Sequence, residues 1–146
     1  MNAVNLKQFV TIIFLAVFVF MSCNNEEDTE KDAEYSGKPI IEFNETSHDF
    51  GDLKEGEIVE CSFRFKNTGK APLIIKDVVP DCGCTVPEFD KEPILPGEES
   101  KIKIVFNSAG FRNNIYKTID VETNTEEGFT ELILTAFIIT DNTVAF

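Results

Sequence analysis

Four cysteines are the residues of this chain with the most evident chemistry, and two of them, Cys82 and Cys84, are separated by a single glycine. Cys61 lies earlier in the chain, and Cys23 lies close to the N-terminus. Thiols can form disulfides, bind soft metal ions or carry a lipid. The sequence around each cysteine therefore indicates whether it forms a disulfide, binds a metal ion or carries a lipid.

Cys23 follows a segment with the features of a bacterial lipoprotein signal peptide. Lys7 supplies a positive charge, residues 9–21 are apolar, and Ser22 is the small residue before the predicted cleavage site. The apolar run would form about 20 Å of helix, which is too short for the roughly 30 Å hydrocarbon core of a membrane. We predict a signal peptide over residues 1–22 and lipidation of Cys23 by palmitate or related acyl chains. An ordinary cleaved secretory signal is the alternative.

Residues 23–37 are predicted to form a flexible tether. Residues 24–37 contain six acids, one lysine and no aliphatic residue larger than Ala33, so they cannot bury enough apolar surface to fold. We therefore expect residues 38–146 to form a domain anchored to the outer membrane of a bacterial cell envelope, either periplasmic or surface-exposed. The acidic run after Cys23 resembles the export tags of surface lipoproteins in the Bacteroidetes. This resemblance implies the surface-exposed location.

From Pro39 onward, apolar and polar residues alternate in the manner of half-buried β-strands. The alternation is clearest over residues 61–66, 101–106 and 119–122, whereas residues 132–139 read as a strand buried on both faces. Between the strands, Pro96-Gly97 suits a type II turn, and we expect positive φ angles at Gly51 and Gly69. The pattern predicts an all-β, immunoglobulin-like antiparallel β-sandwich of about seven strands over residues 38–146.

Five short motifs occur in order along this domain. They are residues 48–51 (HDFG), 65–75 (FKNTGKAPLII), 81–87 (DCGCTVP), 96–98 (PGE) and 105–107 (VFN). Together they resemble the bacterial "domain of unknown function 1573" family over roughly residues 43–138. The resemblance implies a sandwich similar to those of the major sperm protein, the PapD-like chaperones and the Hydin domains. Because these relatives mostly bind proteins, often by adding a strand at a sheet edge, it implies a protein-binding or structural module.

Three thiols remain once Cys23 is assigned to lipid, so at least one has no partner within the chain. One arrangement joins Cys82 to Cys84. A second joins Cys61 to one of these two and closes a loop of more than twenty residues, which would stabilise the sandwich by roughly 3 kcal/mol. We expect this structural bridge. In a third arrangement, reduced thiolates bind Cu(I) or Zn(II) with His48 as a further ligand; all three thiols could also remain reduced and buried.

No group of residues in the sequence indicates catalysis. His48 is the only histidine, and we expect it to be a strand-edge residue bonded to a carbonyl or an acid. Neither Ser47 nor Cys61 accompanies a nucleophile elbow, and the net charge of −13 disfavours nucleic acid as a partner. We predict a non-enzymatic module without a cofactor that binds an unidentified protein. The alternative is a thiol-based redox or soft-metal protein that uses the Cys-Gly-Cys loop.

Overall fold

Eight β-strands make up most of residues 35–140, the part of the chain that this computed structural model describes. The strands are β1 (Ile41–Phe43), β2 (Ser47–Lys54), β3 (Ile58–Asn67), β4 (Ile75–Pro80), β5 (Thr85–Phe89), β6 (Glu99–Asn107), β7 (Asn113–Thr123) and β8 (Phe129–Ile139). Cys23, the predicted signal peptide and all but the last three residues of the predicted tether lie outside the described residues. Within the described range there is no helix long and apolar enough to cross a membrane.

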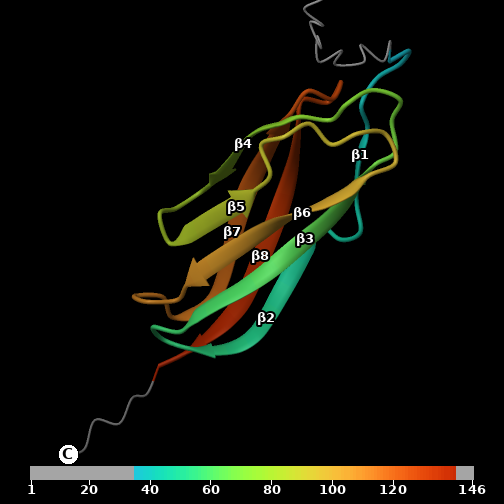
Figure 1. Cartoon of the computed structure of the whole chain (residues 1–146). Coiled ribbons are helices and arrows are strands. Elements are labelled where there is room, and N and C mark those ends of the chain that lie inside the picture. Colours follow the sequence, from blue (N-terminus) through green and yellow to red (C-terminus); the bar gives the residue numbers. More distant parts are fainter. Residues whose placement is uncertain (1–34, 141–146) are drawn as a thin grey trace, which may run out of the picture. The chain divides into compact units, whose positions relative to one another are not determined.

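The strands form two four-stranded sheets packed face to face (Figure 1). One sheet has the order β1-β3-β6-β5 and the other the order β2-β8-β7-β4. Neighbouring strands are antiparallel except β2 and β8, which run parallel. The predicted immunoglobulin-like sandwich is confirmed. It has eight strands because the first extended segment divides into β1 and β2, which join different sheets.

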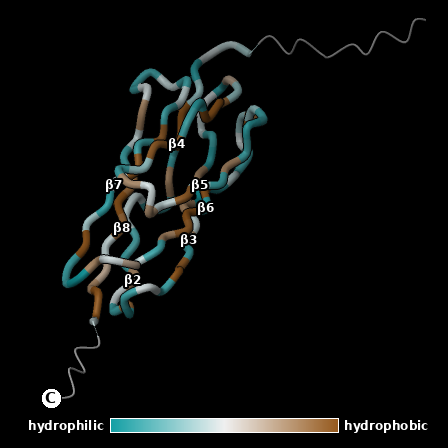
Figure 2. The backbone as a smooth tube through the Cα atoms, turned by 90° about the vertical axis from the view of Figure 1, so that its left-hand side faces the viewer, coloured by the Kyte–Doolittle hydropathy of each residue, from teal (hydrophilic) through white to brown (hydrophobic). Residues whose placement is uncertain are grey.

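The core lies between the sheets and is built from the inward positions of their central strands. The buried side chains include Phe63, Phe65, Ile102, Ile104, Phe106, Ile119, Val121, Leu132 and Leu134. Figure 2 shows apolar residues recurring among polar ones along the strands. Each such side chain contributes roughly 1.5–3 kcal/mol relative to an exposed one, so this alternation largely determines which face of each sheet turns inward.

The outer face of β8 differs from its prediction. Leu132 and Leu134 are buried as expected, but on the opposite face Phe137 is 42% exposed and Ile139 is 41% exposed. The prediction that both faces are buried is therefore wrong. The sandwich has two layers, and the described residues place no third layer over this sheet. The sequence of β8 thus supplies more apolar surface than the fold of the single chain uses.

Gly51 and Gly97 have the positive φ angles predicted for them, and Gly69 does not. Gly51 has a φ of 67° and Gly97 a φ of 85°. The amide of Glu98 donates to the carbonyl of Leu95 at 3.0 Å, which closes the predicted type II turn. Gly69 has no positive φ; a Cβ at this position would instead collide with the backbone of residues 38–40. Gly69 is therefore required by close backbone approach.

Asn67, at the end of β3, organises the loops at one end of the sandwich. Its side-chain amide donates to the carbonyls of Ala71 and Ile94, both at 2.9 Å. Its side-chain oxygen accepts from the backbone amides of Gly69 at 3.0 Å and Ile40 at 3.4 Å. These four bonds use the whole hydrogen-bonding capacity of the fully buried side chain. We call this set, Asn67 with the four backbone groups that it binds, the Asn67 cluster.

Candidate functional site

Residues 81–84 carry the chain from β4 in one sheet to β5 in the other, at the left of the molecule in Figure 1. In this turn Cys82 and Cys84 form a disulfide, with their Cα atoms 5.2 Å apart, while Cys61 is a free thiol. Both β4 and β5 are edge strands. Cys82 and Cys84 are accordingly half-buried, and Gly83 is exposed. We call residues 81–85 the cysteine corner.

The expected structural bridge from Cys61 to this loop is wrong. Cys61 lies opposite Ile104 of β6, and Ile104 lies opposite Pro87 of β5, three residues after Cys84. Cys61 and Cys84 are therefore separated by two strand spacings across the sheet and three residues along it, which places their Cα atoms roughly 14 Å apart. Because bridged cysteines have Cα atoms within about 7 Å of each other, the register of this sheet excludes the bridge.

Thr85, the last residue of the cysteine corner, lies beneath the disulfide. Its side chain is 3% exposed, and its hydroxyl oxygen lies 3.9 Å from the sulfur of Cys82 and 3.7 Å from that of Cys84. The amide of Thr85 also donates to the carbonyl of Cys82 at 3.3 Å. Thr85 lies opposite Phe106 of β6, so it joins the disulfide to the edge of the core. Nothing in the sequence indicates that this hydroxyl faces the sulfurs.

A half-buried cation flanks the same corner. Lys117 points inward from β7, is 16% exposed, and places its ammonium 3.3 Å from the carboxylate of Asp81. The ammonium also lies 5.1 Å from the ring centroid of Phe111, a favourable distance for a cation–π contact. The backbone amide of Asp81 donates to the carbonyl of Thr118 at 3.0 Å. The turn is therefore attached to β7 by both a backbone bond and an ion pair.

Cys61 is in a different environment. It is half-buried against the core, and this burial, with a smaller contribution from the negative charge of Glu45, raises the pKa of its thiol to about 12. The thiol is therefore protonated and unreactive near neutral pH. The Nδ1 atom of His48 lies 3.8 Å from the same Glu45 carboxylate. Between residues 35 and 140 no three or more histidine, cysteine or acidic side chains converge in a way that could hold a metal ion.

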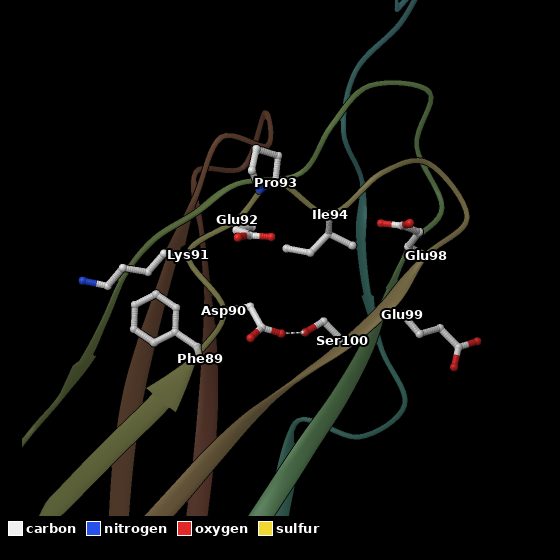
Figure 3. Close-up of a pocket in the computed structure, with 9 residues that line it drawn as sticks. All are labelled: Phe89, Asp90, Lys91, Glu92, Pro93, Ile94, Glu98, Glu99 and Ser100. Carbon is white, nitrogen blue, oxygen red and sulfur yellow. Dashed lines mark hydrogen bonds between the residues drawn. The ribbon is translucent and has the colours of Figure 1, made fainter. Parts of the chain in front are cut away.

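One hollow of about 560 Å³ lies in the loop between β5 and β6 (Figure 3). Asp90 accepts a hydrogen bond from the hydroxyl of Ser100 at 2.8 Å, and the Glu98 carboxylate accepts one from the amide of Leu95 at 2.8 Å. In Figure 3 the side chains of Lys91 and Glu99 point away from the hollow. Two of its acids thus hold the loop itself, as expected for a structural connection.

A second hollow, of about 440 Å³, lies on the outer face of the β2-β8-β7-β4 sheet. It is lined by Asp49, Gly51, Asp52, Asn114, Ile115, Tyr116, Thr135, Ala136 and Phe137, and we call it the β2–β8–β7 groove. Tyr116 is 60% exposed, and it lies diagonally across the β7–β8 pair from Phe137. The register of β2 shifts between Asp49 and Asp52, so a bulge at the left-handed Gly51 forms one wall of the groove.

Solved structures with a similar fold come from bacteria and from human. A protein of unknown function from Porphyromonas gingivalis W83 has a TM-score of 0.62 and 20% identity, over 70% of this chain and 48% of that chain. The PapD-like domain 7 of human CEP192 has a TM-score of 0.55 and 15% identity, over 72% of this chain and 89% of that one. The secreted serine protease VesC from Vibrio cholerae has a TM-score of 0.53 and 11% identity, over 67% of this chain and 23% of that one.

The chain thus spans about half of the Porphyromonas gingivalis protein and under a quarter of VesC. At these identities the likeness establishes the fold alone. No curated protein sequence matches the chain.

A protein-family model described as "Protein of unknown function (DUF1573)" matches residues 41–138. The matched region runs from the first residue of β1 to the penultimate residue of β8. It contains the cysteine corner, the β2–β8–β7 groove and all of the Asn67 cluster except Ile40. The predicted resemblance is therefore confirmed, and the chain belongs to the DUF1573 family.

Proposed function

We propose that this protein is a non-enzymatic protein-binding module that a lipid on Cys23 holds at the bacterial cell envelope. The anchor is supported by the sequence alone, through the short apolar segment, the small residue before Cys23 and the acidic run after it. The domain that follows would then act within reach of the membrane surface, at a distance set by the tether.

The β2–β8–β7 groove is the observation that carries the binding function. Tyr116 and Phe137 are exposed diagonal neighbours on the two central strands of a sheet, where solvated strands usually present polar side chains. Aromatic residues of this kind supply much of the energy of protein interfaces, because they bury a large area at little cost in conformational entropy. The bulge at Gly51 gives this surface a concave wall.

The sheet edges are less suited to binding than this face. The edge strands β4 and β5 contain Pro80 and Pro87, which cannot donate to an added strand. The other two edges are β1, which has three residues, and the bulged β2. Short, bulged or proline-containing edges resist pairing with another chain. We therefore propose binding over the groove and depart from the strand addition that the resemblance implies.

The charge around the groove indicates the chemistry of the partner. Asp49 and Asp52 line one wall, and residues 38–146 carry 20 acids against 11 bases. A partner segment that places an apolar side chain between Tyr116 and Phe137 and a lysine or arginine beside the aspartates would complement both features.

Site-specific crosslinking tests the groove. A photoreactive amino acid replacing Tyr116 in the full chain should crosslink one defined envelope protein, and the additional substitution Phe137→Ser should abolish that product. The same amino acid at Ile58, an exposed apolar residue of β3 in the other sheet, is the matched control and should not give it. Equal crosslinking from both positions would contradict a binding site in the groove.

The anchor has its own test. Cys23→Ala should move the protein from the membrane fraction to the soluble fraction, and mass spectrometry of the wild-type N-terminal peptide should show acyl chains on Cys23. A Cys23→Ala protein that remains in the membrane fraction would refute the lipid anchor without affecting the groove.

A further inference from the structure

The hydroxyl of Thr85 responds to the state of the disulfide beside it. Neither sulfur of a disulfide carries a proton, so in the oxidised protein any hydrogen bond between this hydroxyl and Cys82 or Cys84 is donated by the hydroxyl. A disulfide sulfur is a weak acceptor, whereas a thiolate is a charged and much stronger one. The hydrogen bond of Thr85 therefore gains strength when the S–S bond breaks. Because the hydroxyl lies within 3.9 Å of both sulfurs, it can serve whichever one takes the negative charge.

The charges around the corner favour the same change. The carboxylate of Asp81, next to Cys82 in sequence, would repel a thiolate, but the ammonium of Lys117 lies 3.3 Å from it and neutralises it. Lys117 is itself mostly buried, so its positive charge is less screened by water than that of a surface lysine. The corner can therefore hold a negative sulfur with little electrostatic penalty.

The disulfide is both accessible and isolated. It lies in a turn between two edge strands, with Cys82 and Cys84 half-buried, so a thiol on another molecule can reach a sulfur. Cys61, the third thiol of the described domain, lies roughly 14 Å from the corner by the sheet register. It cannot exchange with the pair inside the folded domain, so Cys82 and Cys84 form a two-electron unit of their own.

We propose that Cys82–Cys84 is an exchangeable disulfide that oxidises a dithiol on a partner protein, with Thr85 as the positioning residue for the leaving thiolate. A partner thiolate attacks one corner sulfur, the S–S bond breaks, and the other sulfur leaves as a thiolate bonded to the Thr85 hydroxyl. The second partner thiolate then attacks the mixed disulfide and releases the remaining corner sulfur. The partner loses two electrons and two protons and gains a disulfide, and the corner becomes two thiols. This exchange is stoichiometric, since the corner ends as two thiols, and is therefore compatible with a non-enzymatic module. It goes beyond the proposed binding function and does not rest on it.

Dithiothreitol serves as the probe dithiol, with the full chain in detergent, and iodoacetamide trapping followed by mass spectrometry counts the thiols formed over time. Thr85→Val keeps the shape of the side chain and removes the hydroxyl; it should slow reduction of the corner about tenfold, the effect of losing one hydrogen bond to a charged group. Thr85→Ser keeps the hydroxyl and should react within about twofold of wild type. A Thr85→Val protein that is reduced as fast as wild type would overturn the role of Thr85.

The pH profile of alkylation provides a second readout that a purely structural role of Thr85 would not move. In the reduced wild-type protein, the pH at which alkylation of the corner reaches half its maximal rate should lie roughly one unit below that of Thr85→Val. Cys61 in the same molecule is the internal control and should remain unlabelled near neutral pH. Corner thiols as unreactive as Cys61, or a disulfide that resists reduction until the domain unfolds, would show a structural bond and overturn the proposal.

Discussion

The Asn67 cluster and the cysteine corner both hold loops to the sandwich, but they do so by opposite chemistry. Asn67 is fully buried, and every donor and acceptor of its side chain is hydrogen-bonded to a backbone group. The corner is partly open to solvent, is closed by a covalent bond, and has one buried hydroxyl directed at two sulfurs. A fully satisfied group has nothing left to offer a ligand, whereas the hydroxyl of Thr85 has partners whose strength depends on their redox state. Two buried polar side chains of one domain can therefore differ in this way, one fully satisfied by the backbone and the other directed at a disulfide.

The largest expected effect is that of removing the Asn67 side chain. Asn67→Ala leaves the carbonyl of Ala71 and the amides of Gly69 and Ile40 without their side-chain partner, while the carbonyl of Ile94 keeps its bond from the amide of Leu73. We therefore expect a loss of roughly 3–5 kcal/mol in the free energy of unfolding, a large share of the stability of a small domain. Chemical denaturation measures it. The exposed neighbour provides the control, because Thr68→Ala should cost less than about 0.5 kcal/mol. A loss below about 1 kcal/mol for Asn67→Ala would mean that water replaces these bonds.

Gly69 tests whether the same cluster is tightly packed. Gly69→Ala would place a Cβ against the backbone of residues 38–40, which can move only by breaking the bond from Ile40 to Asn67; we expect a loss of about 2–3 kcal/mol. Gly51 is the matched control, since it has room for a Cβ and only its positive φ opposes one. Gly51→Ala should therefore cost about 1 kcal/mol. Equal losses would indicate that the 38–40 segment yields easily.

Removing the disulfide should have a smaller effect on stability than removing one buried amide. The bond between Cys82 and Cys84 spans a sequence separation of only two residues, and the chain entropy lost on closing so small a ring is worth at most about 1.5 kcal/mol. The double variant Cys82→Ser, Cys84→Ser should lose no more than this in thermal or chemical denaturation, and the reduced wild-type protein should match it. A loss above about 3 kcal/mol would assign the corner the structural role of the Asn67 cluster.

Local alternation predicted much of this fold, and contacts distant in sequence determined the rest. The inward positions of Phe63, Phe65 and Ile104 follow from the two-residue period of a strand, which is visible in the sequence. The pairing of Cys82 with Cys84 depends on the register of three strands, which the sequence does not state. Gly69 shows the same limit, because the obstacle to a side chain there comes from a segment some thirty residues earlier.

The two candidate sites were also unequally visible. The Cys-Gly-Cys sequence marks the corner, but only the contacts of Thr85 with the sulfurs show that this residue belongs to it. The apolar residues on both faces of β8 are visible in the sequence, where they predict burial within the chain. An apolar outer face looks the same in sequence whether its own chain or a partner covers it, so the β2–β8–β7 groove could not be predicted.

Cys61 gives the smallest expected effect, and it contrasts a thiol half-buried against the core with the accessible sulfurs of the corner. Its thiol pKa is about 12 in the folded domain, raised by burial and then by Glu45, against an ordinary value of 9.0. Below about pH 9 the folded and unfolded states are both protonated, so the thiol has no effect on how stability changes with pH. As the pH rises from 9 toward 12, the unfolded state loses its proton first, and the free energy of unfolding falls.

The Cys61→Ala variant has no thiol to titrate at this position, so its free energy of unfolding at each pH is the reference for that of wild type. The stability advantage of wild type over Cys61→Ala should therefore shrink between pH 8.5 and 10.5, a range chosen about the ordinary thiol value, and stay constant from pH 6 to 8. Because the thiol is only half-buried, water screens part of the effect, and the slope will be shallower than full burial would give. Urea denaturation at each pH measures it. A difference that stays flat to pH 10.5 would show that the thiol of Cys61 ionises as freely in the folded domain as in the unfolded chain, and the contrast with the corner would then rest on accessibility alone.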